Sequence, residues 1–196
     1  MIEKVDFRYS DDITVVNRAQ FEAHVRLYEG YVNSINKIDE QLNGTEAGRS
    51  EANTTFGTFR DLKRGETYAL NGVILHELYF QNIGGTQSEP DPLTAQRISQ
   101  DYGCVSDWIE DFIATAKVSR GWAVLAYEQR TGRLRNVSLD SHDLGNIAYY
   151  APILVLDMYE HAYFLQYGDN KNEYITNFMK NIDWEVIRNR IEPFCF

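Results

Sequence analysis

The amino-acid sequence predicts an α+β protein, in which an N-terminal antiparallel helical hairpin precedes an α/β lobe with a small antiparallel sheet. Three observations predict this class. Apolar residues recur at three- and four-residue steps over residues 18–38, a Gly- and Pro-rich segment interrupts the chain at residues 84–92, and strand-like segments flank a turn at residues 131–132. The interruption predicts one lobe over residues 1–85 and a second over residues 86–196.

The hairpin is expected to contain two helices joined by a polar loop. The first covers residues 18–38 and presents one apolar and aromatic face, made of Phe21, Val25, Tyr28, Tyr31, Val32 and Ile35. The second is expected over residues 67–82. Residues 43–50 between them are small and polar, which predicts a loop between antiparallel neighbours.

The second lobe mixes helices and strands. Residues 93–117 are expected to be helical, and residues 121–127 and 134–139 are expected to form strands on either side of the turn. The remainder is expected to be helical, most clearly over residues 174–191.

Composition and charge exclude several classes of protein. With 43% apolar and 24% charged residues, the 196-residue chain has the composition of a globular protein. A formal net charge of −10 argues against a nucleic-acid partner, which needs a basic face. The longest apolar stretch, residues 148–156, is far shorter than the roughly 20 residues of a membrane helix, so no membrane span is expected.

The compartment expected from the sequence is the cytoplasm. Residues 1–6 lack the basic and apolar regions of a signal peptide. The two cysteines, Cys104 and Cys195, lack metal-type spacing and are expected to be free thiols in a reducing compartment.

Asp157 and His161 are the first candidates for chemistry. On a helical turn, a spacing of four residues would place both on one side, close enough to share an ion. A capping Asp followed by an ordinary buried His is the alternative. Apolar residues precede and follow the pair, which predicts burial, and buried ionisable groups are costly unless they are paired or bind metal.

Three segments resemble the iron/manganese superoxide dismutase family. Residues 157–167 (DMYEHAYFLQY), with residues 177–185 (NFMKNIDWE), are similar to its C-terminal signature. Residues 71–80 (NGVILHELYF) are similar to its second-helix motif, and Gly121-Trp122-Ala123 is a third landmark. The similarity extends over essentially the whole chain.

This resemblance implies a mononuclear metal site between the two lobes, which disproportionates superoxide to oxygen and hydrogen peroxide. The implied ligands are His24, His76, Asp157 and His161. The implied cofactor is iron as first choice, or manganese, with one ion per subunit. Three neutral imidazoles and one carboxylate suit a redox-active first-row metal and leave room for one water or hydroxide.

The resemblance also implies two catalytic residues beside the metal, Tyr31 and His142. Tyr31 matches the gateway hydroxyl of the family, and Tyr28 is expected to replace a gateway His. His142 stands where manganese members usually carry an outer-shell Gln that bonds the metal's water. Gly72 stands at the corresponding iron-type position, and this small residue is consistent with a polar side chain at 142. With these ligands, every histidine of the chain is assigned to the site.

The chain departs from the family pattern at several positions. Tyr159, Val124 and Met179 replace residues that are usually larger or aromatic, which changes the shielding of the metal. The first helix is one residue short between the expected ligand and Tyr31. Either Ala23 occupies the ligand position or His24 does, and we expect His24 because Ala cannot coordinate a metal.

The resemblance implies a homodimer in which Glu160 of one subunit bonds His161 of the other. It also implies that Arg26 and Lys171 line the approach of the anionic substrate, and Arg188 is a further basic candidate. Two other functions are considered. A metal-deficient interaction protein with this fold would have lost ligands, and a metal hydrolase would need an additional general base.

Overall fold

The computed structural model describes residues 1–195, except for the side chain of Glu46. The α-helices are α1 (Arg18–Asn43), α2 (Thr58–Gln81), α3 (Pro92–Tyr102), α4 (Val105–Val118), α5 (Glu160–Tyr167), α6 (Lys171–Lys180) and α7 (Trp184–Ile191). The strands are β1 (Trp122–Glu128), β2 (Arg133–Leu139) and β3 (Tyr150–Asp157). Short 3-10 turns cover Thr45–Ala47, Arg49–Glu51 and Glu192–Phe194. The architecture confirms the predicted α+β class.

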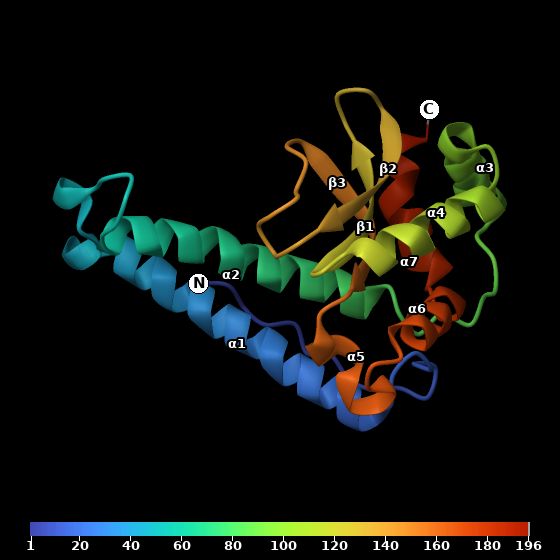
Figure 1. The fold of residues 1–196 in the computed structure, drawn as a ribbon, viewed down its shortest axis with the longest axis horizontal. Coiled ribbons are helices and arrows are strands. Elements are labelled where there is room, and N and C mark those ends of the chain that lie inside the picture. Colours follow the sequence, from blue (N-terminus) through green and yellow to red (C-terminus); the bar gives the residue numbers. More distant parts are fainter. Residues whose placement is uncertain (196) are drawn as a thin grey trace.

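The N-terminal hairpin is made by α1 and α2, which run antiparallel along each other (Figure 1). Gly65 and Gly72 on α2 face Ile38 and Tyr31 on α1. A Cβ atom at Gly65 would lie 3.2 Å from Ile38 Cδ1, and one at Gly72 would lie 3.0 Å from the Tyr31 ring. The two glycines are two helical turns apart on α2, and Tyr31 and Ile38 are two turns apart on α1. The glycines therefore let the helices approach closely at both points and fix the register of the hairpin.

The second helix is longer than the sequence predicts. It begins at Thr58, not near residue 67, and α1 continues to Asn43. The additional turns lie in the part of the hairpin that projects away from the rest of the molecule (Figure 1). A helix that has little to pack against needs no wide apolar stripe, so residues 58–66 carry little of the periodic signal.

The sheet has the order β2-β1-β3, with antiparallel pairing throughout. The central strand β1 is almost fully buried, with α4 packed on β1 and β2, and with α2 and α7 packed on β3. The register of β1 and β3 shifts at Leu125 and Ala126, where Ala126 faces Pro152. A bulge on an edge strand tolerates a proline, which cannot donate a ladder hydrogen bond.

Three of the predicted helical segments were wrong in part. Residues 150–157 form strand β3, because a short apolar run has no periodicity that separates a strand from a buried helix. The expected helix over residues 93–117 is divided into α3 and α4 at Gly103, whose φ of 89° ends α3. The segment over residues 174–191 is likewise divided, into α6 and α7.

Polar side chains join the hairpin to the sheet. Asn82, at the end of α2, accepts a hydrogen bond from Val155 N at 2.9 Å and donates to Val155 O at 3.2 Å. Arg190 of α7 donates to Ile153 O and to Leu78 O. The buried apolar residues of both halves form one continuous core. The division at residues 85 and 86 therefore stays a prediction.

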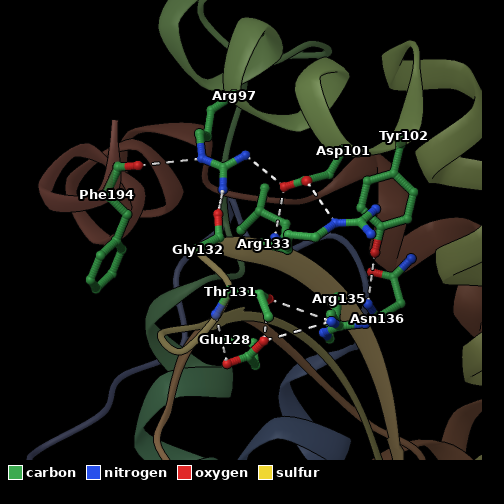
Figure 2. A network of polar contacts seen from close by, with 11 residues as sticks. Arg97, Asp101, Tyr102, Glu128, Thr131, Gly132, Arg133, Arg135, Asn136 and Phe194 are labelled. Atoms are coloured by element: carbon green, nitrogen blue, oxygen red, sulfur yellow. Dashed lines mark hydrogen bonds and ion pairs between the residues drawn. The ribbon is translucent and has the colours of Figure 1, made fainter. Parts of the chain in front are cut away.

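Arg97 of α3 is the centre of a second polar network, at the far end of the sheet (Figure 2). Its side chain is 5% exposed. The guanidinium donates to Asp101 Oδ2 at 2.7 Å, to Gly132 O at 2.8 Å and to Phe194 O at 3.3 Å. It thereby ties helix α3, the β1–β2 turn and the C-terminal segment to one side chain.

Asp101 is held ionised within this network. Burial acts to raise the pKa of its carboxyl, but hydrogen bonds from Leu134 N and Arg97 outweigh it and lower that pKa. Arg133 adds a third hydrogen bond at 3.2 Å.

None of the helices in residues 1–195 is both long and apolar enough to cross a membrane.

We expect Arg97→Met to lower the free energy of unfolding by roughly 3 kcal/mol, because it removes the guanidinium that pairs with the largely buried Asp101 carboxylate and bonds two carbonyls. Chemical denaturation measures this change. Arg133→Met is the matched control, since Arg133 is 55% exposed and its loss should cost about 1 kcal/mol or less. Equal losses from the two variants would contradict the central role of Arg97.

Candidate metal centre

Four side chains from four elements converge on one point inside the protein. They are His24 of α1, His76 of α2, Asp157 at the end of β3 and His161 of α5, and one possible ligand atom from each lies within 4.8 Å of all the others. Each histidine turns its Nε2 atom toward Asp157 Oδ2, at 3.0 Å for His24, 3.5 Å for His76 and 3.1 Å for His161. The structure therefore brings together the four residues expected to bind metal.

The backbone fixes the Asp157 carboxylate. Asp157 is the last residue of β3, paired with Trp122 of β1, and the next residue, Met158, donates its N–H to Gly121 O at 2.8 Å. The second carboxylate oxygen, Oδ1, accepts a hydrogen bond from Tyr159 N at 2.9 Å. The sequence analysis expected Asp157 and His161 to lie on one helical turn. The structure shows that they do not. A strand ends at the carboxylate, and the next helix begins at Glu160.

His76 carries the observation that tests whether a metal ion fits. Its Nδ1 atom donates to Gly72 O at 2.6 Å, so the neutral ring has its lone pair on Nε2. That Nε2 atom is buried and has no hydrogen-bond partner among the described residues. A buried polar atom without a partner costs about 1–3 kcal/mol. A cation between the four side chains would remove this cost, so the residues fit a metal ion.

The placement of His24 bears on the two interpretations of the first helix. Helix α1 is α-helical from Arg18 to Asn43, and it directs His24 toward Asp157 with 2% exposure of the residue. Tyr28, one turn later, does not line an opening. It is fully buried, and its hydroxyl accepts a hydrogen bond from Val5 N and donates to Glu77. These contacts give no support to the expected gateway role of Tyr28, which stays a prediction.

The electrostatics leave the cluster ready to coordinate a cation. Burial acts to raise the pKa of Asp157, but its interactions with His161 and His24 outweigh it and hold that pKa well below its usual range. Burial lowers the pKa of His24 and of His76. At neutral pH the group therefore offers an ionised carboxylate and neutral imidazoles at His24 and His76, the protonation states that metal binding requires.

His161 differs from the other two histidines. Although burial acts to lower its pKa, the adjacent Asp157 carboxylate outweighs burial and raises it. Its side chain is also the most exposed of the four, at 24%. The Tyr159 ring stacks on it, with the ring centroids 5.1 Å apart and the planes 15° apart. Tyr159 therefore shields this ligand candidate at the position where the family usually has Trp.

His142 links Trp122 to Tyr31 beside the cluster. The Trp122 indole N–H donates to His142 Nδ1 at 2.9 Å, and His142 Nε2 lies 2.8 Å from the Tyr31 hydroxyl. An indole nitrogen can only donate, so the neutral His142 ring carries its proton on Nε2 and donates it to Tyr31 Oη. The hydroxyl proton of Tyr31 is then available to a different acceptor.

Gly72 provides the space for this arrangement. A Cβ atom at this position would lie 3.0 Å from the Tyr31 ring, and its carbonyl receives the hydrogen bond from His76. The Tyr31 and His142 rings lie edge to face, with centroids 4.8 Å apart. A larger residue at position 72 would displace Tyr31 from His142.

The three basic residues considered for the approach of the anionic substrate lie in three different parts of the structure. Lys171 donates to Ser119 O at 2.9 Å, and burial lowers the pKa of its amine. Arg26 lines a cavity of about 420 Å³ between α1 and the N-terminal segment, and Arg188 lines a separate one of about 320 Å³ on α7. Neither cavity is lined by the four clustered residues.

Two relevant interactions were not predicted from the sequence. Trp122 was recognised as a landmark, but its hydrogen bond to His142 was not. Tyr68 of α2 packs against the His142 ring, with centroids 4.6 Å apart. No spacing rule reports such contacts, because the residues are far apart in the chain.

Comparison with known proteins agrees with this geometry. A family model described as the C-terminal domain of iron/manganese superoxide dismutases matches residues 90–190. The chain belongs to the iron/manganese superoxide dismutase family.

Named relatives of this family align with most of the chain. The protein named superoxide dismutase [Fe] from Aquifex aeolicus is 40% identical over 174 residues, which cover 88% of this chain and 80% of the relative. Superoxide dismutase [Mn] 2 from Haloferax volcanii is 36% identical over 173 residues, covering 86% and 83%. Superoxide dismutase [Mn] 1 from Halobacterium salinarum is 35% identical over 172 residues, covering 86% and 82%. The resemblance inferred from the motifs is confirmed.

For this family member, His142→Gln should change how stability depends on pH. Burial lowers the pKa of His142 to about 4 from its ordinary value of 6.5. Between these values the unfolded chain binds a proton that the folded chain does not, so this residue makes stability fall as the pH falls. Gln does not titrate. Urea unfolding at pH 7, 6, 5 and 4 should show wild type losing stability relative to the variant, by at most about 1.4 kcal/mol per pH unit. Parallel curves would contradict a buried neutral His142.

Proposed function

We propose that the chain is a superoxide dismutase with one iron or manganese ion bound by His24, His76, Asp157 and His161. The observation that carries the proposal is the buried group of three imidazole nitrogens around one carboxylate oxygen. The unpartnered Nε2 of His76 supports a cation at this point. Iron is our first choice, and relatives named for iron and for manganese both support the proposal.

The reaction converts two superoxide ions and two protons to one oxygen and one hydrogen peroxide. The metal, when bound, supplies a reversible one-electron couple. The residues of the chain hold the ion, limit the access of water and deliver protons. Trp122 and Tyr159 are large side chains against the cluster, with the Trp122 ring centroid 5.0 Å from that of His76. Both restrict the space in which a small anion is bound.

We propose that Tyr31 and His142 are the catalytic residues that manage protons. Burial raises the pKa of Tyr31, so its hydroxyl is protonated at neutral pH. Because His142 Nε2 donates to Tyr31 Oη, the Tyr31 O–H is directed to another acceptor, which we assign to the substrate side. Trp122 holds the His142 ring in the tautomer that this requires.

We further propose a homodimer in which Glu160 and His161 bridge the interface. Glu160 is exposed at the start of α5, and no residue in the described part of the chain bonds Nδ1 of His161. Phe164 and Leu165, on the same helix, are 53% and 70% exposed, an apolar surface that supports a contact between copies. We place the protein in the cytoplasm, which its two free cysteines support.

A metal-deficient interaction protein is not favoured, because all four donors are present and converge. The division into lobes at residues 85 and 86 remains part of our proposal. It places His24 and His76 in the first lobe and Asp157 and His161 in the second, so both lobes are needed to complete the metal site.

The first test measures metal and activity together. Wild type should contain close to one iron or manganese per chain and consume superoxide. Asp157→Ala should lower metal content by about tenfold or more and abolish activity, because it removes the carboxylate that the three imidazoles face. Asp169→Ala, at an exposed position, is the control and should retain both. Wild type with zinc alone and no activity after iron or manganese loading would reject the function.

The second test concerns the interface. Glu160→Ala should weaken the dimer and lower the activity of dilute protein, because the proposed bond joins the interface to a metal ligand. Glu110→Ala, which removes an exposed carboxylate from α4, is the control. Analytical ultracentrifugation and a superoxide assay at matched concentrations measure both effects. A fully active Glu160→Ala monomer would contradict the bridging role.

A further inference from the structure

Gln20 is a fully buried polar residue on α1, one turn before His24. A buried carboxamide is destabilising unless its donor and acceptor groups are both used. In α1 the spacing of four residues places Gln20 and His24 on the same face. The helix that carries one metal-ligand candidate therefore presents a buried amide beside it.

Both ends of the Gln20 carboxamide bond the backbone of α5. Its Nε2 donates to His161 O at 2.6 Å, and its Oε1 accepts from Leu165 N at 2.9 Å. These two backbone groups are the acceptor and donor of one i, i+4 pair of helix α5. The side chain of α1 thus spans the turn of α5 that begins at the ligand candidate.

Other contacts of helix α5 come from its tyrosines, two of which pack on Tyr174 of α6, and the Tyr167 hydroxyl bonds Val15 O. The helix is eight residues long, and its buried residues are Ala162 and Tyr163. His161 is the most exposed member of the cluster. A second bond, from the N–H of Asn17 at the N-cap of α1 to Gln166 Oε1, lies at the exposed end of the contact. Gln20 is therefore a buried side chain that hydrogen-bonds the helix of His24 to the backbone of the helix of His161.

We infer that Gln20 is a positioning residue for the metal centre, which sets His161 relative to His24 through the backbone of α5. This inference rests on the proposed function, because it assigns Gln20 a role at the proposed metal site. Gln20 touches neither metal nor substrate. It acts through the two hydrogen bonds, by fixing how far α5 lies from α1.

The test uses the full-length protein, stripped of metal and titrated with Mn²⁺. Gln20→Met keeps a similar volume and removes both hydrogen bonds. We expect a 10- to 100-fold weaker affinity for Mn²⁺, as for other residues that orient ligands, and an altered electron paramagnetic resonance spectrum of the Mn²⁺-loaded protein. Gln20→Glu should lose less affinity, because a protonated carboxyl in this buried position can make both bonds.

Ile35→Val is the matched control, a conservative truncation of a buried residue on the same helix, outside the metal cluster. It should retain the wild-type affinity and spectrum. The inference is overturned if Gln20→Met keeps the wild-type affinity and spectrum, or if Ile35→Val reproduces the changes. Should Gln20→Met fail to fold, Gln20→Leu, which also removes both hydrogen bonds, decides by the same two measurements. A wild-type chain that binds neither Mn²⁺ nor Fe²⁺ rejects the proposed function as well, whereas an active wild type with an unchanged Gln20→Met variant rejects this inference alone.

Discussion

One buried carboxylate oxygen organises this protein. Asp157 Oδ2 faces imidazole nitrogens from α1, α2 and α5, so three helices that are distant in sequence must meet at the end of one strand. Burial of ionisable groups is unfavourable without mutual compensation, and this compensation requires all three helices to be in place. The hairpin, the sheet and α5 are therefore coupled through the same atoms that are proposed to bind metal.

The surrounding hydrogen bonds orient the side chains of the cluster. His76 is held by a carbonyl of its own helix, Asp157 by the amide of Tyr159, and His161 by the carboxamide of Gln20 acting on its helix. Each partner fixes an orientation that packing alone would leave free. The site is built in the folded chain by groups that are not themselves in its donor set, which is how proteins hold ligands in the geometry a metal requires.

The sequence predicts the class of fold and the convergence of the four candidate ligands better than it predicts individual elements. The motifs around His76 and Asp157 carry the chemistry, because ligand types recur with characteristic neighbours. Strand β3 was missed because an apolar run has no period, and the outer turns of α2 because they have little to pack against. The bond from His142 to Tyr31 joins residues more than a hundred positions apart, so only the tertiary fold reveals it.

Asn82 has a consequence for the behaviour of the protein in concentrated solution. Strand β3 is an edge of the sheet, and an open edge is a template on which another chain can add a strand. The Asn82 side chain bonds both the N–H and the carbonyl of Val155, the way a neighbouring strand would. The Asn82 side chain, at the end of α2, thus occupies the backbone hydrogen-bonding groups in the middle of this edge. Strand β3 is therefore protected there from pairing with another molecule.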